Sequence, residues 1–153
     1  MTKITLDKAT RAPVYTFDFT DKVKLGSLSQ EETYEVFRDG RFAAHFLERE
    51  LTKHFHLSFV NKTGYDHVDP TGQKYDAKNF TKRGLSFMPS NQLGEGRKFN
   101  ADVAHAKAKE LIYICCDIVD FPKVRVKFAY GADLVKEYPK CKVPKGYREA
   151  LFG

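Results

Sequence analysis

The sequence has no long apolar run and no cysteines at the C-x-x-C spacing of a zinc site. These absences argue against a membrane-spanning protein and against a zinc-binding one. No apolar stretch approaches the length of about 18 residues that a membrane-spanning helix needs, and the N-terminus lacks the apolar core of a signal peptide. The cysteines Cys115, Cys116 and Cys141 do not have the C-x-x-C spacing of a zinc site, and His54 and His56 do not complete one. We therefore expect a cytoplasmic protein with no zinc and no membrane partner.

The chain also lacks Gly/Ser-rich or Pro-rich segments that would act as linkers. Its 153 residues are 42% hydrophobic and include thirteen Phe and eight Tyr, which is enough apolar material for one core. We expect residues 1–153 to form a single domain. The formal net charge of +6 suits a polyanionic partner, but a surplus of this size also occurs on proteins that never meet nucleic acid.

Two acids and a lysine are closely spaced around a turn in residues 64–78. Asp66 precedes the turn signal Asp69-Pro-Thr-Gly72, and Asp76-Ala77-Lys78 follows it. If the second segment is a strand, Asp76 and Lys78 share one face, and only the main-chain carbonyl of Ala77 lies between them. Two carboxylates and a carbonyl form a hard oxygen site suited to Mg²⁺, and the ammonium is placed to orient or deprotonate a water. The alternative is a solvated acid and lysine on an edge strand.

The same segment resembles the catalytic signature of the PD-(D/E)XK nucleases, and most closely that of the PvuII-like type II restriction endonucleases. The resemblance includes residues that bind no metal. The matching positions are Gly64, Asp66, Val68, Asp69, Gly72, Gln73, Tyr75, Asp76 and Lys78.

This resemblance implies a fold, a cofactor and a partner. It implies an α/β fold with a restriction-endonuclease-like mixed central sheet flanked by helices. Asp66, Asp76 and the Ala77 carbonyl would bind Mg²⁺, for which Mn²⁺ would substitute, and Lys78 would position the water. An aspartate stands at position 76, where the family more often has glutamate. The expected substrate is double-stranded DNA, cut by a homodimer into products with 5′-phosphate and 3′-hydroxyl ends.

A helix ahead of this hairpin supplies one more candidate. The segment from about Arg41 to Phe55 has helical periodicity, and its apolar residues share one broad face. Glu50 projects into that face, whereas Glu48 falls on the opposite, charged side. An acid on an apolar stripe is costly unless it is paired or bound to metal, so Glu50 is the predicted helix acid of the site. Pairing of Glu50 with its helix neighbours is the alternative. The predicted apolar face comprises Phe42, Ala43, Phe46, Leu47 and Leu51.

The segment between residues 81 and 100 is polar, basic and without periodicity. Arginine and lysine can pair with guanine edges or phosphates, and asparagine or glutamine can address adenine. We predict that it reads DNA, and a solvent-exposed loop is the alternative. The candidate DNA-binding residues are Lys82, Arg83, Asn91, Gln92, Arg97 and Lys98.

Regular elements are predicted on both sides of the site. Ser29 and Glu32 have the spacing of a capping box and predict a helix that ends near Phe37. The alternation in residues 14–19 predicts one strand of an N-terminal hairpin. Residues 57–60 read as the first core strand. Further predicted elements are a helix capped by Asn100 over residues 100–109, a central strand over 110–118 and an alternating strand over 123–130.

The resemblance extends roughly over residues 45–139, which we take as the catalytic core, with residues 1–40 as an N-terminal extension and 140–153 as a basic tail. The predicted activity is Mg²⁺-dependent, sequence-specific cleavage of double-stranded DNA, of the restriction or homing type. Two alternatives remain: a structure-specific nuclease that resolves DNA junctions, and a non-catalytic DNA-binding protein that keeps the hairpin as a scaffold. The tail either follows DNA phosphates or is solvated.

Overall fold

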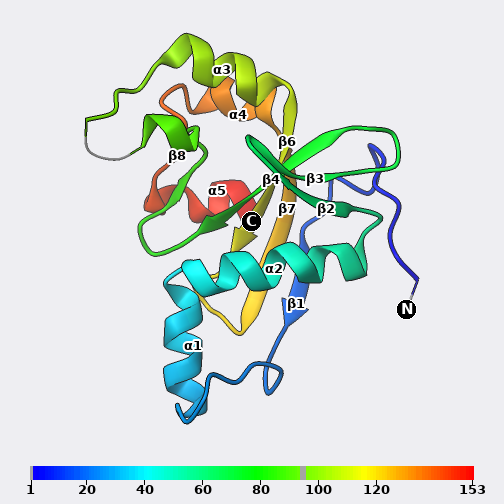
Figure 1. Cartoon of the computed structure of the whole chain (residues 1–153), viewed down its shortest axis with the longest axis vertical. Helices are drawn as coiled ribbons and strands as arrows, with labels where there is room; N and C mark the ends of the chain where they lie inside the picture. Colours follow the sequence, from blue (N-terminus) through cyan, green and yellow to red (C-terminus); the bar gives the residue numbers. More distant parts are fainter. Residues whose placement is uncertain (1, 94–95) are drawn as a thin grey trace.

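A mixed six-stranded sheet forms the centre of the computed structural model, which describes residues 2–93 and 96–153 (Figure 1). The strand order is β1-β7-β6-β4-β3-β2, and only the β4–β6 pair is parallel. The chain is therefore an α/β protein with a mixed sheet. The strands of this sheet are β1 (Tyr15–Asp18), β2 (Ser58–Lys62), β3 (Tyr65–Val68), β4 (Lys74–Phe80), β6 (Leu111–Asp117) and β7 (Lys123–Tyr130).

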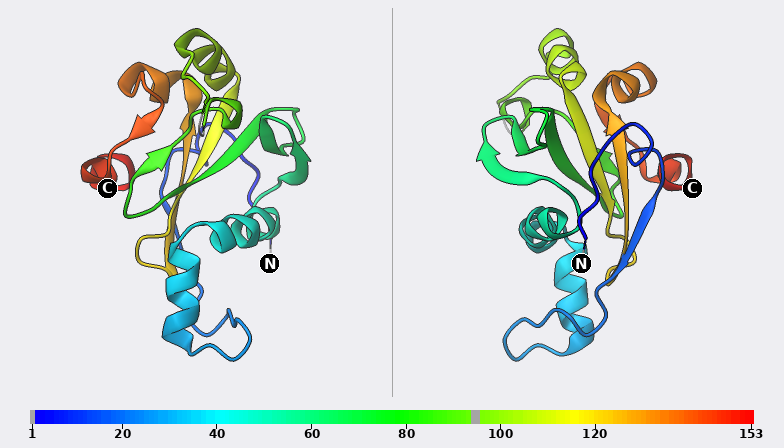
Figure 2. Two further views of the ribbon diagram at one scale, coloured as in Figure 1. Left: turned by 60° about the vertical axis from the view of Figure 1, so that its left-hand side comes forward. Right: turned by 90° about the vertical axis from the view of Figure 1, so that its right-hand side faces the viewer.

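Helices cover both faces of this sheet. In Figure 2, α2 lies on one side of the strands, and α4 and α5 lie on the other. None of the described helices is both long enough and apolar enough to cross a lipid bilayer. Within the described residues the helices are α1 (Gln30–Arg38), α2 (Arg41–His54), α3 (Ala101–Lys109), α4 (Gly131–Glu137) and α5 (Arg148–Phe152), with short 3₁₀ turns η1 (Ser90–Gln92) and η2 (Lys145–Tyr147) and a small β5 (Leu85–Ser86)–β8 (Lys142–Val143) sheet.

The central strands follow directly from their composition. Every residue of β6 is buried, because this apolar strand has neighbours on both edges and helices on both faces. The neighbouring β7 alternates: Val124, Val126 and Phe128 pack beneath α1 and α2, and the residues between them face the other way. Both strands match the predicted ranges to within a residue or two.

Local capping signals fix two of the helices as predicted. The Ser29 side chain accepts from the Glu32 N–H, and the Glu32 carboxylate accepts from the Ser29 N–H, which closes the capping box of α1. The Asn100 side chain accepts from the Val103 N–H at the start of α3. Between α1 and α2 the chain turns at Gly40, whose φ of +105° few other residues tolerate.

Three sequence predictions about the outer elements are corrected. β1 does not form an N-terminal hairpin but pairs with β7, more than a hundred residues later in the chain. β2 is an edge strand with mostly exposed or half-buried residues rather than a core strand. The segment predicted as a basic tail packs into the molecule, because Cys141, Val143 and Phe152 are buried against the α3–α4 face of the sheet.

Candidate carboxylate and lysine site

The β3–β4 hairpin that carries the predicted motif is held by Asp69. One carboxylate oxygen of Asp69 accepts from the N–H groups of Thr71 (2.9 Å) and Gln73 (3.1 Å), and the other accepts from the Tyr75 hydroxyl at 2.8 Å. Burial tends to raise the pKa of Asp69, but these hydrogen bonds outweigh it and lower that pKa. Asp69 and Tyr75 thus set the turn that aligns the two strands, which explains their place in a motif whose chemistry lies elsewhere.

Asp76 and Lys78 lie on one face of β4, as the strand period predicts. The Lys78 Nζ is 3.2 Å from the Asp76 Oδ2. Asp76 is only 7% exposed, and this burial raises its pKa to about 6, against the opposing charge of Lys78. Asp66, from β3, is close enough to hydrogen-bond to Asp76 and adds to the rise. The hairpin therefore brings two carboxylates into contact beside a single lysine.

A pocket of about 440 Å³ opens over these groups, and we name it the carboxylate pocket. Its wall includes Asp66, Asp76, Ala77 and Lys78 from the hairpin and Glu48 from α2. Burial raises the pKa of Glu48, and the negative charge of Asp76 contributes to the rise, although His45 and Arg49 oppose it. A third carboxylate therefore faces the same space as the two predicted ones.

The predicted helix acid, Glu50, is not part of the described wall of this pocket. Its carboxylate lies 3.6 Å from the His54 Nε2 and 3.9 Å from the Lys53 Nζ, at the partly buried edge of the same helix, so it pairs with its helix neighbours. The reason is the rotation of α2 on the sheet. Ala43 and Leu47 face the core and Phe42 is 53% exposed, so the apolar stripe is narrower than predicted.

His67 fixes α2 in this orientation. Its ring is fully buried in β3, and its Nε2 lies 2.8 Å from the main-chain carbonyl of Glu48. Burial lowers the pKa of His67, so the ring is neutral and donates to that carbonyl from Nε2. The contact joins the helix that carries Glu48 to the hairpin that carries Asp66. No sequence pattern predicts this link, because it depends on how a helix crosses a strand nineteen residues away.

The predicted DNA-binding residues divide between two places. Lys82 and Arg83 are exposed on a turn that follows β4, where they line a separate hollow beside α1. Asn91 is exposed next to the carboxylate pocket, and Arg97 donates from Nη1 to the Ser90 carbonyl at 2.9 Å. Lys98 is also exposed. The structure does not bring these residues together into one surface patch.

Gln92 is corrected, because its side chain is not available to read a base. Gln92 is 8% exposed, its Oε1 accepts from the Asn100 N–H at 2.9 Å, and its Nε2 donates to the Asn100 carbonyl at 3.2 Å. The amide thus satisfies both main-chain groups of the residue that caps α3. A polar residue that resembles a recognition residue in the sequence is a structural clamp in the fold.

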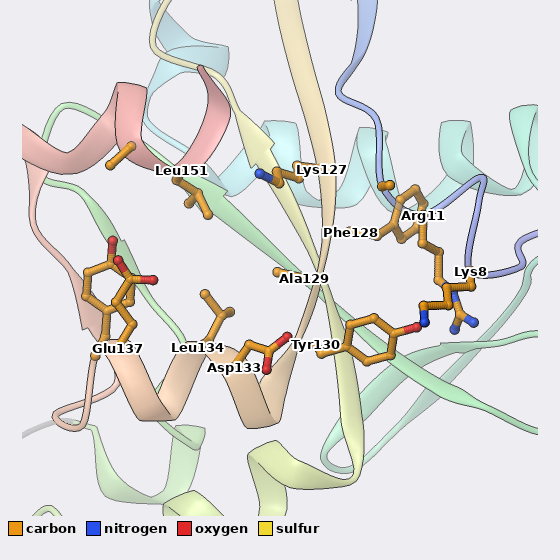
Figure 3. A pocket seen from close by; sticks show the side chains of 13 residues that line it. Lys8, Arg11, Lys127, Phe128, Ala129, Tyr130, Asp133, Leu134, Glu137 and Leu151 are labelled. Atoms are coloured by element: carbon orange, nitrogen blue, oxygen red, sulfur yellow. The ribbon is translucent and has the colours of Figure 1, made fainter.

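Another hollow, of about 370 Å³, lies against β7 and α4, away from the carboxylates (Figure 3). Figure 3 shows Tyr130 extending toward Lys8 and Arg11, and the Arg11 guanidinium is 5.4 Å from the centre of that ring. This hollow is lined by charged groups of both signs, since Asp133 lies in its wall together with Lys8 and Arg11. It gathers none of the groups that the motif predicts for chemistry.

The donors in the carboxylate pocket fit a hard divalent cation. Asp66, Asp76 and the Ala77 carbonyl offer only oxygen, the ligand type that Mg²⁺ prefers. Two acids in contact, one of them buried, are also short of positive charge, which a divalent ion would supply. Over residues 2–93 and 96–153, no three His, Cys, Asp or Glu side chains are gathered closely enough to form a metal site by themselves. The fit therefore depends on the two aspartates and the main-chain carbonyl.

No protein-family model matches the chain, and no curated protein matches its sequence. A function is therefore inferred from the residues that the hairpin and α2 bring together.

Proposed function

We propose that the protein is a Mg²⁺-dependent deoxyribonuclease that hydrolyses phosphodiester bonds in double-stranded DNA. The observation that carries the proposal is the carboxylate pocket, where Asp66 and Asp76 meet with Lys78 3.2 Å from Asp76. A buried acid with a raised pKa beside a second acid costs stability, and such arrangements cluster at functional sites. The proposed fold type is restriction-endonuclease-like, which the mixed sheet and its flanking helices support.

Each residue has a role in this proposal. Asp66, Asp76 and the Ala77 carbonyl would hold Mg²⁺, with Mn²⁺ as a substitute, and a bound ion would supply positive charge beside the scissile phosphate. Lys78 would align the attacking water through its ammonium group, and solvent would accept the proton of that water and supply one to the departing 3′-oxygen. The water oxygen forms a bond to phosphorus as the bond to the 3′-oxygen breaks, which leaves 5′-phosphate and 3′-hydroxyl ends. Glu48, rather than Glu50, would support the metal from α2.

The proposal includes sequence-specific cutting by a homodimer, in which each copy cuts one strand of a short symmetric site. Two alternative functions predict different results in cleavage and binding assays. A junction-resolving nuclease would cut four-way junctions and leave linear duplex intact. A non-catalytic DNA-binding protein would bind duplex equally well with and without Mg²⁺ and cut neither substrate.

The test is incubation of the purified protein with a long, sequenced linear DNA in Mg²⁺, followed by sequencing of the ends. A parallel reaction contains EDTA, and a four-way junction is a second substrate. We expect discrete Mg²⁺-dependent fragments, and Lys78→Ala should lower the cleavage rate by about 10²- to 10⁴-fold. Lys136→Ala, which removes an exposed lysine from α4, is the matched control. Equal cleavage by Lys78→Ala and the control would contradict the mechanism.

A further inference from the structure

Lys107 of α3 lies between the carboxylate pocket and a second, adjoining pocket. The second pocket has a volume of about 360 Å³, within the range of sites for small ligands, and we name it the flanking pocket. Lys107, Tyr65 and Ser90 line both pockets, so the two form one continuous surface. The flanking pocket is further lined by Lys74 and Asn91.

The position of Lys107 follows from the local structure around it. Ala104 and Ala108 face the core from α3, which places Lys107 at the edge of the helix and partly buried. It extends over Gly64, in the turn between β2 and β3. A Cβ on Gly64 would lie 3.2 Å from the Lys107 Cε and 3.4 Å from its Nζ. The absence of a side chain at Gly64 therefore leaves room for the ammonium group directly above this turn, two residues before Asp66.

The charge of Lys107 is available to a ligand. Among the described residues, no carboxylate lies within 4.0 Å of its Nζ, whereas the Lys78 Nζ is already 3.2 Å from Asp76. A second ammonium, that of Lys74, lies 4.9 Å from the centre of the Tyr65 ring. The flanking pocket thus presents two cations and an aromatic face, with Glu110 as the only acid in its described wall. This combination is suited to a nucleotide phosphate and its adjoining base or sugar.

We propose that the flanking pocket binds the phosphate next to the scissile phosphate on the same DNA strand, and that Lys107 is the residue that contacts it. The proposal rests on the proposed nuclease function, because it places the scissile phosphate in the carboxylate pocket. Lysine acts on phosphate as a point charge and does not read bases, so this contact adds affinity without sequence preference. The smallest ligand that spans both pockets is a nucleoside 3′,5′-bisphosphate.

A calorimetric titration tests this without cleavage. Thymidine 3′,5′-bisphosphate and thymidine 5′-monophosphate are titrated in Ca²⁺ into the wild type, Lys107→Ala, Lys107→Arg and Lys109→Ala. The wild type should bind the bisphosphate about tenfold more tightly than the monophosphate, the effect of one charged hydrogen bond. Lys107→Ala should lose this preference and Lys107→Arg should keep most of it. Lys109→Ala removes an exposed lysine from the same helix and should keep all of it.

Two results would overturn the proposal. One is a wild type that binds both nucleotides equally or binds neither, and the other is a Lys107→Ala variant that retains the preference. Circular dichroism confirms that each variant is folded. Lys107→Gln, which keeps most of the length of the side chain, repeats the test if the alanine variant does not fold.

The titration and a cleavage assay separate this proposal from the nuclease function. If the protein cuts DNA, Lys107→Ala should raise KM with little change in kcat, and should reduce the salt dependence of DNA binding by about one counterion. DNA cleavage with an unchanged Lys107→Ala titration would retain the nuclease and overturn the flanking site. A preference for the bisphosphate that depends on Lys107, without any cleavage, would retain the phosphate site and overturn the nuclease.

Discussion

Two buried aspartates on the same face of the sheet, Asp76 and Asp117, have very different partners. Asp117 is 1% exposed at the end of β6, and its Oδ2 accepts from the Arg125 Nη2 at 2.8 Å and from the Arg148 Nε at 2.9 Å. Its other oxygen accepts from the Val119 N–H. Asp76 is almost as deeply buried, yet it has one lysine and a second acid beside it.

This difference separates a structural acid, Asp117, from Asp76, the acid to which the proposed function gives a catalytic role. A buried carboxylate that is matched by two guanidinium groups stabilises the fold around it, and losing it leaves Arg125 and Arg148 with only the exposed carboxylates of Glu149 and Asp120. A buried carboxylate placed against another carboxylate does the opposite, because its charge is poorly compensated. The sheet therefore carries one acid that maintains the structure and one that weakens it, and the second is the one that the motif assigns to chemistry.

The largest expected effect is the loss of the structural acid. Asp117→Asn should lower the free energy of unfolding by about 3 kcal/mol, because Arg125 and Arg148 lose their shared buried partner and keep only the exposed carboxylates of Glu149 and Asp120. Urea denaturation followed by circular dichroism measures it. Asp133→Asn changes an exposed acid on α4 and should leave the urea midpoint unchanged. Equal midpoints for Asp117→Asn and this control would show that the cluster contributes nothing to stability.

The stability of the protein should respond in the opposite direction to the loss of Asp76, the proposed metal ligand. Asp76→Asn should raise the free energy of unfolding at pH 7 by about 1–3 kcal/mol in EDTA while abolishing cleavage, because it removes a poorly compensated buried charge. The folded-state pKa of about 6 lies above the ordinary value of 3.8, so the folded state binds more protons between these values. The Asp76 carboxyl therefore contributes stability that is present below about pH 4 and is lost as the pH rises through 6, and comparison with Asp76→Asn isolates this contribution from that of the other carboxyls.

Urea denaturation of the wild type and of Asp76→Asn at a series of pH values from about 3.5 to about 8 provides the check. This range includes the ordinary aspartate pKa of 3.8 and the folded-state pKa of about 6. The difference in unfolding free energy between Asp76→Asn and the wild type should be near zero at the acid end and should grow through pH 6. A difference that is constant across this range would mean that the Asp76 carboxylate is not the source of the effect.

The hairpin could be predicted from the sequence because its determinants are local. The turn at Asp69–Gly72, the strand after it and the shared face of Asp76 and Lys78 all depend on neighbouring residues, and the structure has each of them as predicted. The strands β6 and β7 and the caps of α1 and α3 were also predictable, since composition and capping residues determine them locally.

The remaining features depend on contacts between distant segments. Glu48 faces the pocket because of the way α2 is rotated on the sheet and held by His67. That rotation cannot be predicted from the helical periodicity of the sequence. Gln92 is a clamp because its side-chain amide hydrogen-bonds to the main chain of Asn100, eight residues later in the sequence. The terminal helix α5 has only five residues, too few for its buried Leu151 and Phe152 to produce a recognisable period.

A matched pair of variants tests whether Glu48 or Glu50 is the acid of α2 that serves the site. Glu48→Gln should lower the cleavage rate by about 10- to 100-fold, the usual effect of losing a group that supports a metal site. Glu50→Gln makes the same chemical change two residues away, where the carboxylate faces His54, and should leave the rate nearly unchanged. Single-turnover cleavage in Mg²⁺ gives both rates. The reverse order of effects would restore Glu50 to the site and reject the orientation of α2.

The smallest effect is expected at the rim of the Asp117 cluster. Glu149 accepts from the Arg125 Nη2 at 2.8 Å, but its side chain is 71% exposed, so water and salt screen the pair. Glu149→Gln should shift the urea midpoint by a small fraction of the Asp117→Asn shift, and the residual shift should vanish in high salt. The same denaturation experiment at low and high NaCl measures both variants. If Glu149→Gln lowered the urea midpoint as much as Asp117→Asn does, the exposed pair between Arg125 and Glu149 would be the contact that stabilises the fold. The buried carboxylate would then be only an accessory to it, and the contrast between the two aspartates would no longer hold.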